Sequence, residues 1–206
     1  MAPAAYSITD GWRDYFAPVV RRAGFKGSGR HFSRLAGDFV QTISLQGSRS
    51  GGRFAVNLGL QPLAIPDAIG KIVDPTSIKE IDCQFRRRLS QNGADQWWDY
   101  APTKESIAKA TISAASLFED AGLLLFGEQS GSEAPFLTIT ASQLADGVFS
   151  FSGFRASVPR IAQDLALLRL AGGDEAEARE FAMIAVERAS RQWRMRPELE
   201  ALLRIV

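Results

Sequence analysis

Residues 31–60 read HFSRLAGDFVQTISLQGSRSGGRFAVNLGL, and this stretch decides the fold. Apolar and polar side chains alternate along 31–35, 39–46 and 53–60, and this period of two predicts three β-strands. Short turns rich in glycine separate them. Because short loops join consecutive strands, we expect the strands to pair in antiparallel order.

The two sides of the predicted sheet differ in polarity. The apolar side belongs in the core and carries Phe39, Ile43, Leu45, Phe54, Val56, Leu58 and Leu60, with Gln41 among them. The other side carries polar residues, among them Thr42, Ser44, Gln46 and Asn57. We expect this polar side to stay uncovered and to serve a ligand or a partner.

Two further strands are predicted, at 81–90 and, as an edge strand, at 96–100. Alternation in the first places Cys83, Arg87 and Phe85 on one side of the sheet. Its polar side carries Arg86 and Arg88. An arginine among apolar side chains needs a partner, and Asp95 and Asp99 follow across the next turn as candidates.

Helical spacing flanks these strands on both sides. Residues 9–24 predict an N-terminal helix in which Pro18 marks a start or a kink. Beyond the strands, helices are predicted at 104–120, 157–171 and 174–188, with a last one opened by Pro197. The sequence therefore predicts an α+β fold with four to five antiparallel strands. We expect a single domain over 1–206, with a sheet-bearing part at about 1–101 and a helical part at about 102–206.

Composition excludes several classes of protein. The 206 residues have a net charge of +1, with one cysteine and one histidine, so neither a disulfide framework nor a zinc site is expected. No apolar run suggests a membrane span, and no signal peptide is evident. We expect a cytoplasmic protein without a cofactor. The balance of charge makes nucleic acid an unfavoured partner.

Cations gather at the start of the predicted sheet, where residues 24–31 read GFKGSGRH. Lys26, Arg30, His31 and Arg34 could surround an anion, because glycines let backbone N–H groups approach it. The alternative is a turn that ends the helix and leaves these cations in solvent. His31 would need an orienting carboxylate to act as a base, and Asp38 is the acid nearest in sequence, so we expect no catalytic site.

Trp97 and Trp98 stand beside the arginines of the fourth strand. Paired aromatic residues near cations could stack the bases of a single-stranded nucleic acid. The alternative is that one tryptophan fills the core and the other covers the edge of the sheet.

The order of several short motifs resembles a bacterial family known as domain of unknown function 4304. The motifs are GFK at 24–26, GRHFSR at 29–34, Gln41 with LQGS at 45–48, FAVNLG at 54–59, RRRL at 86–89 and DQWW at 95–98. They cover roughly residues 10–100. The resemblance implies a helix packed on an antiparallel sheet, and it brings no established activity, cofactor or catalytic residue.

The sequence leaves three functions open. The first is a non-enzymatic module that binds a protein through the polar, arginine-bearing side of the sheet. The second is an enzyme or sensor of a small anion, such as a phosphorylated metabolite, at the basic turn. The third is binding of nucleic acid. The candidate ligand-binding residues are Lys26, Arg30, His31, Arg34, Gln46, Asn57, Arg86, Arg88, Trp97 and Trp98.

Overall fold

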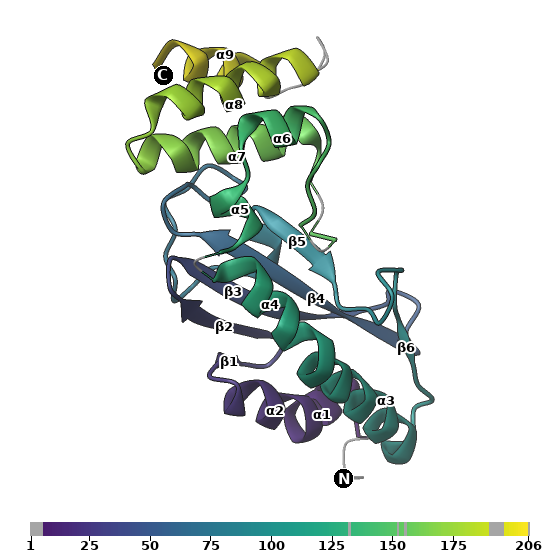
Figure 1. The fold of residues 1–206 in the computed structure, drawn as a ribbon. Coiled ribbons are helices and arrows are strands. Elements are labelled where there is room, and N and C mark those ends of the chain that lie inside the picture. The colour runs from purple at the N-terminus through teal and green to yellow at the C-terminus, as the bar shows by residue number, and fades with distance from the viewer. Residues whose placement is uncertain (1–5, 132, 152, 155, 190–195, 206) are drawn as a thin grey trace.

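A computed structural model describes residues 6–131, 133–151, 153–154, 156–189 and 196–205 of the chain (Figure 1). Within these residues it shows an α+β fold with a six-stranded antiparallel sheet. The strands lie in the order β1 to β5, and β6 pairs with β4 beyond the end of β5. Their bounds are β1 Lys26–Ser28, β2 His31–Ala36, β3 Phe39–Gly47, β4 Arg53–Pro62, β5 Phe85–Arg88 and β6 Trp98–Asp99.

The three central strand predictions are confirmed, and β1 is an addition to them. The basic, glycine-rich run folds back on itself, so that Lys26–Ser28 pairs with His31–Ser33 in a hairpin. Gly29 in its turn has a φ of +63°, a conformation that glycine adopts without the strain of a side chain. The turn that the sequence predicts at this place is therefore the tip of a hairpin at the edge of the sheet.

The N-terminal helix is continuous but changes its winding before Pro18. It consists of α1 Ile8–Gly11, a π-helical turn at Trp12–Phe16, and α2 Ala17–Arg22. Proline has no N–H to donate within a helix, and its ring would clash with the carbonyl four residues earlier. The wider π turn before Pro18 makes room for the ring, so the helix continues through it. It begins at Ile8, one residue before the predicted start, with Ser7 as its N-cap. The result places the Trp12 ring, stacked at 3.9 Å on Phe16, against the sheet.

The helix predicted at 104–120 runs further than expected. It comprises α3 Lys104–Leu117, a second π-helical turn at Phe118–Gly122, and α4 Leu123–Ser130. Gly122 does not end it, because it lies inside the π turn, where a β-carbon would come within 2.5 Å of the Phe118 ring. Ile112, a predicted core residue, is exposed.

The region 104–138 is long and apolar enough to cross a membrane by length and composition alone, although α4 ends at Ser130. In the structure its apolar side is used within the fold. Phe118 and Phe126 are fully buried and pack on Phe25 of the sheet layer. Part of this region therefore contributes to the core, while Leu124 is exposed.

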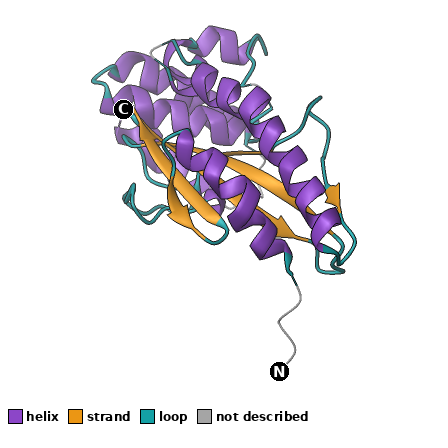
Figure 2. Ribbon diagram, turned by 90° about the horizontal axis from the view of Figure 1, so that it is seen from below, coloured by secondary structure: helices purple, strands orange, loops and turns teal. Residues whose placement is uncertain are grey.

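Helices cover the apolar side of the sheet. The α1–α2 and α3–α4 helices contact one another and lie across the strands, as the view from below shows (Figure 2). Gln41 is buried on this side because all its polar atoms have partners. Its amide donates to the Phe126 carbonyl and the Ser130 hydroxyl, and its carbonyl accepts from Arg34.

The middle of the polar side of the sheet is covered, contrary to the expectation from the sequence, whereas His31 and Gln46 on the same side stay exposed. The segment 63–83 between β4 and β5 folds back over it. Thr42 and Ser44 are only 1% and 6% exposed. Ser44 donates to Glu80, and Thr42 lies 3.3 Å from the Cys83 sulfur. These two polar residues are structural.

Two buried amides anchor the covering segment. The Gln61 side chain donates to the carbonyls of Pro62, Ile65 and Pro66 and accepts from the Gln84 backbone N–H. The Gln84 side chain donates to the carbonyls of Pro66 and Asp67. These bonds tie the segment to both strands that it connects, β4 and β5.

Cys83 lies on the polar side of the sheet, so its predicted place beside Phe85 is wrong. Glu80–Asp82 form a 3-10 turn and β5 begins only at Phe85, so strand alternation does not reach back to the cysteine. Its burial is as expected. The thiol fits because residue 59 has no side chain: a β-carbon on Gly59 would lie 2.4 Å from Thr42 and 2.9 Å from Cys83.

Replacing Gly59 by alanine tests this close contact. We expect Gly59→Ala to destabilise the protein by about 1–3 kcal/mol, because the added methyl group overpacks the space under Cys83. The measurement is chemical denaturation. The double variant Gly59→Ala, Cys83→Ala should regain part of the loss, whereas a single variant as stable as the wild-type chain contradicts the packing described.

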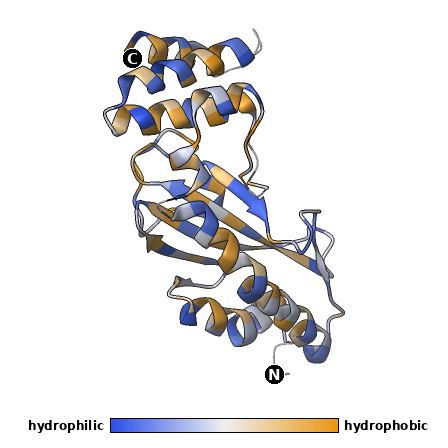
Figure 3. Cartoon of the chain, viewed as in Figure 1, coloured by the Kyte–Doolittle hydropathy of each residue, from blue (hydrophilic) through white to orange (hydrophobic). Residues whose placement is uncertain are grey.

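The helices that follow α4 lie mostly beyond one end of the sheet (Figure 1), although Phe136 stacks on Phe85 of β5 with 4.0 Å between the ring centroids. They are α5 Pro135–Thr138, α6 Ala141–Ala145, α7 Val158–Ala171, α8 Glu175–Arg188 and α9 Arg196–Ile205. The predicted helices at 157–171 and 174–188 are thereby confirmed, and the last helix begins next to Pro197. Polar and apolar residues alternate around α7 and α8 (Figure 3).

One arginine joins α7 to the sheet. Arg160 donates to the Gln84 side chain and to the Ala68 carbonyl. Its guanidinium lies 3.7 Å from Asp164, one turn further along α7. Asp164 is 1% exposed, and neither of its carboxylate oxygens has a hydrogen-bond donor among the described residues. Burial raises the pKa of Asp164 to about 7, although Arg160 opposes the rise.

The raised pKa of Asp164 predicts a loss of stability as the pH rises. Below its ordinary pKa of 3.8 the carboxyl is protonated in both the folded and the unfolded chain. Between that value and about 7 only the unfolded chain ionises freely, so the free energy of unfolding falls, by up to about 4 kcal/mol. Asp164→Asn should lack this fall in denaturation measured from pH 4 to 8.

The matched control for this test is Asp120→Asn, which removes an exposed carboxylate of the same type. It should keep the pH dependence of the wild-type chain. If the free energy of unfolding of Asp164→Asn falls between pH 4 and 8 as much as that of the wild type, the pKa of Asp164 is not raised in the folded chain.

Candidate functional site

The polar side of the sheet carries one row of chemically active side chains across four strands. The register places His31 opposite Ser44, Ser44 opposite Asn57, and Asn57 opposite Arg88. Glu80, from the covering segment, reaches the middle of this row and accepts a 3.1 Å hydrogen bond from Ser44. Burial raises the pKa of Glu80, against the opposing effects of that hydrogen bond and of Arg86 and Arg88.

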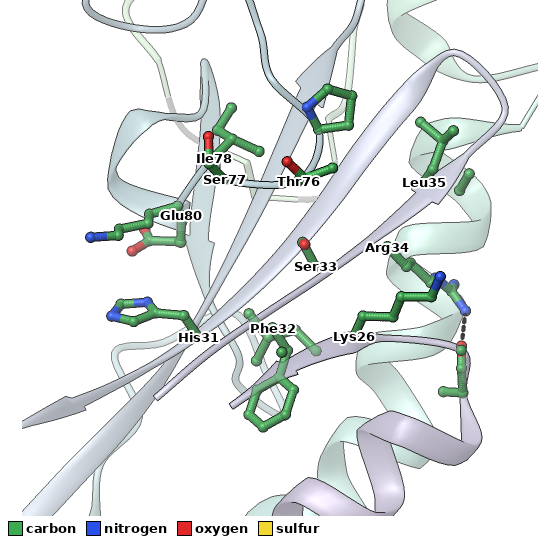
Figure 4. A pocket seen from close by; sticks show the side chains of 17 residues that line it. Lys26, His31, Phe32, Ser33, Arg34, Leu35, Thr76, Ser77, Ile78 and Glu80 are labelled. Carbon is green, nitrogen blue, oxygen red and sulfur yellow. Dashed lines mark hydrogen bonds between the residues drawn. The ribbon is translucent and has the colours of Figure 1, made fainter. Parts of the chain in front are cut away.

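Glu80 separates two clefts. The larger, of about 880 Å³, lies between β2 and residues 75–80 of the covering segment (Figure 4). A volume of this size is typical of sites for small molecules. Its polar or charged lining residues are Lys26, His31, Ser33, Arg34, Thr76, Ser77, Lys79 and Glu80. We refer to it as the β2 cleft.

His31 lies at the Glu80 end of the β2 cleft (Figure 4). Partial burial lowers its pKa below 6.5, and the positive charges of Lys79 and Arg30 lower it further. The imidazole is therefore mainly neutral at pH 7. The suggested pairing with Asp38 is wrong, because Asp38 lies in the turn beyond the opposite end of β2.

Lys26 and Arg34 lie at the other end of the β2 cleft (Figure 4). The Arg34 guanidinium donates to Gln41 and to the Ala23 carbonyl and lies over the Phe25 ring, 4.6 Å from its centroid. Burial lowers the pKa of Arg34. These contacts hold the guanidinium in place at the cleft wall without a carboxylate.

The basic side chains of the β2 cleft, of which Lys26, Arg34 and Lys79 carry charge, have no counterions within the part of the chain that the structure describes. None of Lys26, His31 and Lys79 forms an ion pair there, and neither does Arg34. Asp74 is next to Pro75, which lines the cleft. Its carboxylate accepts hydrogen bonds from the hydroxyls of Thr76 and Ser77, and these bonds lower its pKa. The cleft thus presents positive charge to solvent.

The smaller cleft, of about 380 Å³, lies on the other side of Glu80. Asn57, Arg86, Arg88 and Asp95 are among the residues that line it. Its arginines form the hydrophilic end of β5 (Figure 3). Arg88 forms an ion pair with Asp95 and donates to Gln46 and Asn57, whose side chains also bond to each other. Most polar groups of this cleft therefore already have partners.

The acid across the turn pairs with Arg88 and not with Arg87. Arg87 faces the helix-covered side with Phe85, as predicted, but it donates to the Arg88 carbonyl and the Ser90 hydroxyl. These oxygens accept hydrogen bonds from the Arg87 guanidinium near the end of β5, so its burial does not require Asp95 as a partner. Asp95 remains available to Arg88.

The two tryptophans have different roles. Trp98 is buried and stacks on Phe54 at 5.6 Å, so it belongs to the core. Trp97 is half-buried at the sheet edge, where its indole donates to Asp95. The guanidinium groups of Arg53 and Arg88 lie over its ring, at 4.9 and 4.5 Å from the centroid. The structure thus confirms the alternative in which one tryptophan fills the core and the other covers the edge of the sheet.

The structure divides the predicted site residues between several places. Lys26, His31 and Arg34 meet in the β2 cleft, and Arg30 lies beside it in the hairpin turn. Asn57, Arg86 and Arg88 meet in the smaller cleft with Gln46 nearby. Lys79 and Glu80 join the site without having been predicted, because nothing in their spacing shows that the segment between β4 and β5 folds back over the sheet.

The β2 cleft offers charged and hydroxyl groups to a ligand. In the described ranges, no group of three or more histidine, cysteine or acidic residues could hold a metal ion. Cys83 is buried, and burial raises the pKa of its thiol to about 12, which keeps it protonated and unreactive. The cationic β2 cleft can bind an anion through charge and through the hydroxyl of Ser33.

Comparison with known proteins identifies a family. The chain matches the family described as domain of unknown function (DUF4304) over residues 16–126, and it belongs to that family. No curated protein and no solved structure matches it. The matched residues run from α2 to α4 and include every residue that lines the β2 cleft, whereas α5 to α9 lie outside the match.

Proposed function

We propose that this protein is a non-enzymatic binding module whose β2 cleft takes an anionic ligand. The observation that carries the proposal is the meeting of Lys26, His31, Arg34 and Lys79 around one cleft, without an ion pair to any of them among the described residues. Uncompensated cations in a concave site attract phosphate or carboxylate groups.

The β2 cleft supports this function better than the polar side of the sheet. Ser44 and Thr42 are covered, and Arg88 already has Asp95 as its counterion. Nucleic acid is less favoured, because Trp98 is buried and two guanidinium groups lie over Trp97. A cytoplasmic location and a single domain over 1–206 stay predictions from the sequence.

Anion binding is tested with inorganic phosphate and with malonate. Either ion should raise the melting temperature of the full chain, since a ligand at a hundred times its Kd stabilises by about 2.7 kcal/mol. Lys79→Gln should weaken binding roughly threefold, because it removes one partly exposed charge. Arg49→Gln, which removes an exposed cation from the β3–β4 loop, should leave binding unchanged. Equal weakening by both variants would show unspecific screening instead of a site.

The pKa of His31 provides a second test of the site. A bound anion favours the charged imidazolium, so it should raise the lowered pKa of His31 toward or above 6.5. Binding then takes up a proton, and affinity should increase as the pH falls through this pKa. The measurement is an NMR titration of the single histidine with and without phosphate. An unchanged pKa at saturating phosphate would place the anion elsewhere.

A further inference from the structure

Building on the proposed function, we infer that the ligand of the β2 cleft is a carboxylic acid with an apolar tail, such as a medium-chain fatty acid. Its carboxylate lies over Ser33, among the basic side chains, and its tail covers Leu35. Three features of the structure point to this ligand: the basic residues all precede Leu35 along the cleft, an apolar side chain is exposed beyond them, and the hydroxyl groups of the covering segment are already bonded.

The charged part of the β2 cleft surrounds Ser33. Lys26 is opposite Ser33 in the register of β1 and β2, so its side chain is on the same face as Ser33 and as His31. Lys79 lines the cleft from the covering segment, and its positive charge lowers the pKa of His31, so the two side chains are close. A carboxylate over Ser33 accepts from its hydroxyl and interacts with the charges of Lys26 and Lys79.

The apolar part of the β2 cleft begins at Leu35. This side chain lines the cleft and is 60% exposed, although it lies within the sheet (Figure 4). Pro75 and Ile78 of the covering segment also line the cleft and are half-buried. Among the residues that the structure shows to line the cleft, no cation follows Leu35 along β2, and the next turn carries the acid Asp38. This end therefore disfavours a second anionic group and favours an apolar tail.

The hydroxyl groups of the covering segment are not free to bind a sugar. Thr76 and Ser77 line the cleft, but their hydroxyls donate to the carboxylate of Asp74, at 2.7 and 2.8 Å. A ligand that needs these donors would have to break both bonds, which costs free energy. A phosphorylated sugar is therefore a poorer match than a carboxylic acid, whose tail needs no hydrogen-bond partner.

The spacing along β2 sets a lower limit on the length of the tail. Leu35 lies two residues beyond Ser33, and a rise of about 3.3 Å per residue separates the two positions by about 7 Å. Acetate bound over Ser33 therefore does not reach Leu35, whereas the tail of a medium-chain acid covers it. The cleft volume of about 880 Å³ accommodates a ligand of this size.

The test measures the dissociation constants of acetate, butyrate, hexanoate and octanoate by NMR titration of the full chain. Each covered methylene group should tighten binding about threefold, so octanoate should bind at least about thirtyfold tighter than acetate. 1-Octanol has the same tail without the charge and should bind more weakly than octanoate. Saturating octanoate should also raise the pKa of His31.

Two variants separate the tail from the carboxylate. Leu35→Thr keeps a residue that suits a strand and removes apolar surface, so it should weaken octanoate binding at least about threefold and leave acetate binding unchanged. Lys79→Gln should weaken both acids by the same factor, since it acts on the carboxylate. The matched control is Ile72→Thr, which changes a 95% exposed isoleucine of the covering segment outside the cleft lining. It should affect neither acid.

Three outcomes overturn the inference or the function beneath it. If acetate and octanoate both raise the pKa of His31 but bind equally well, the cleft binds small anions and only the inference fails. If 1-octanol binds as tightly as octanoate, or if Leu35→Thr leaves octanoate binding unchanged, the tail is not held over Leu35 beside a bound carboxylate, and the inference fails again. If no anion, phosphate included, changes the pKa of His31, the proposed function fails with it.

Discussion

The fold and its site depend on how the segment between β4 and β5 is held over the polar side of the sheet. Gln61 and Gln84 are both buried. Their side chains donate five hydrogen bonds to carbonyls of residues 62–67, and a sixth joins the Gln84 backbone N–H to the Gln61 side chain. Buried amides are stable only when their donors and acceptors are satisfied, so this network fixes the segment in one position. The same position brings Lys79 and Glu80 to the sheet and creates both clefts.

The covering segment gives the polar residues beneath it a structural role. Ser44 and Thr42 stabilise the cover, while His31 remains at its margin and faces a cleft. A row of polar residues in register therefore has two roles, structural in the middle and available at the edge. Lys26 and Lys79, which form no ion pair among the described residues, also lie at this edge.

Family membership and the site coincide along the chain. The matched residues 16–126 contain the sheet, α2, α3 and the first half of α4, and the whole lining of the β2 cleft. The helices that follow reach the sheet through Arg160, which bonds to Gln84 and to the loop at Ala68. They can thus influence the covering segment without lining the β2 cleft.

The sequence by itself determined the central hairpins, the apolar side of the sheet, most helices and the α+β class, because these follow from local periodicity and turn residues. It also placed Lys26, His31 and Arg34 near one another, since a short hairpin joins them. Only the tertiary structure decided that residues 63–83 cover Ser44, that Cys83 faces Thr42, and that Lys79 completes the cationic cleft. These contacts join residues about 35 to 50 positions apart through the packing of an irregular segment, for which no periodic pattern of side chains exists.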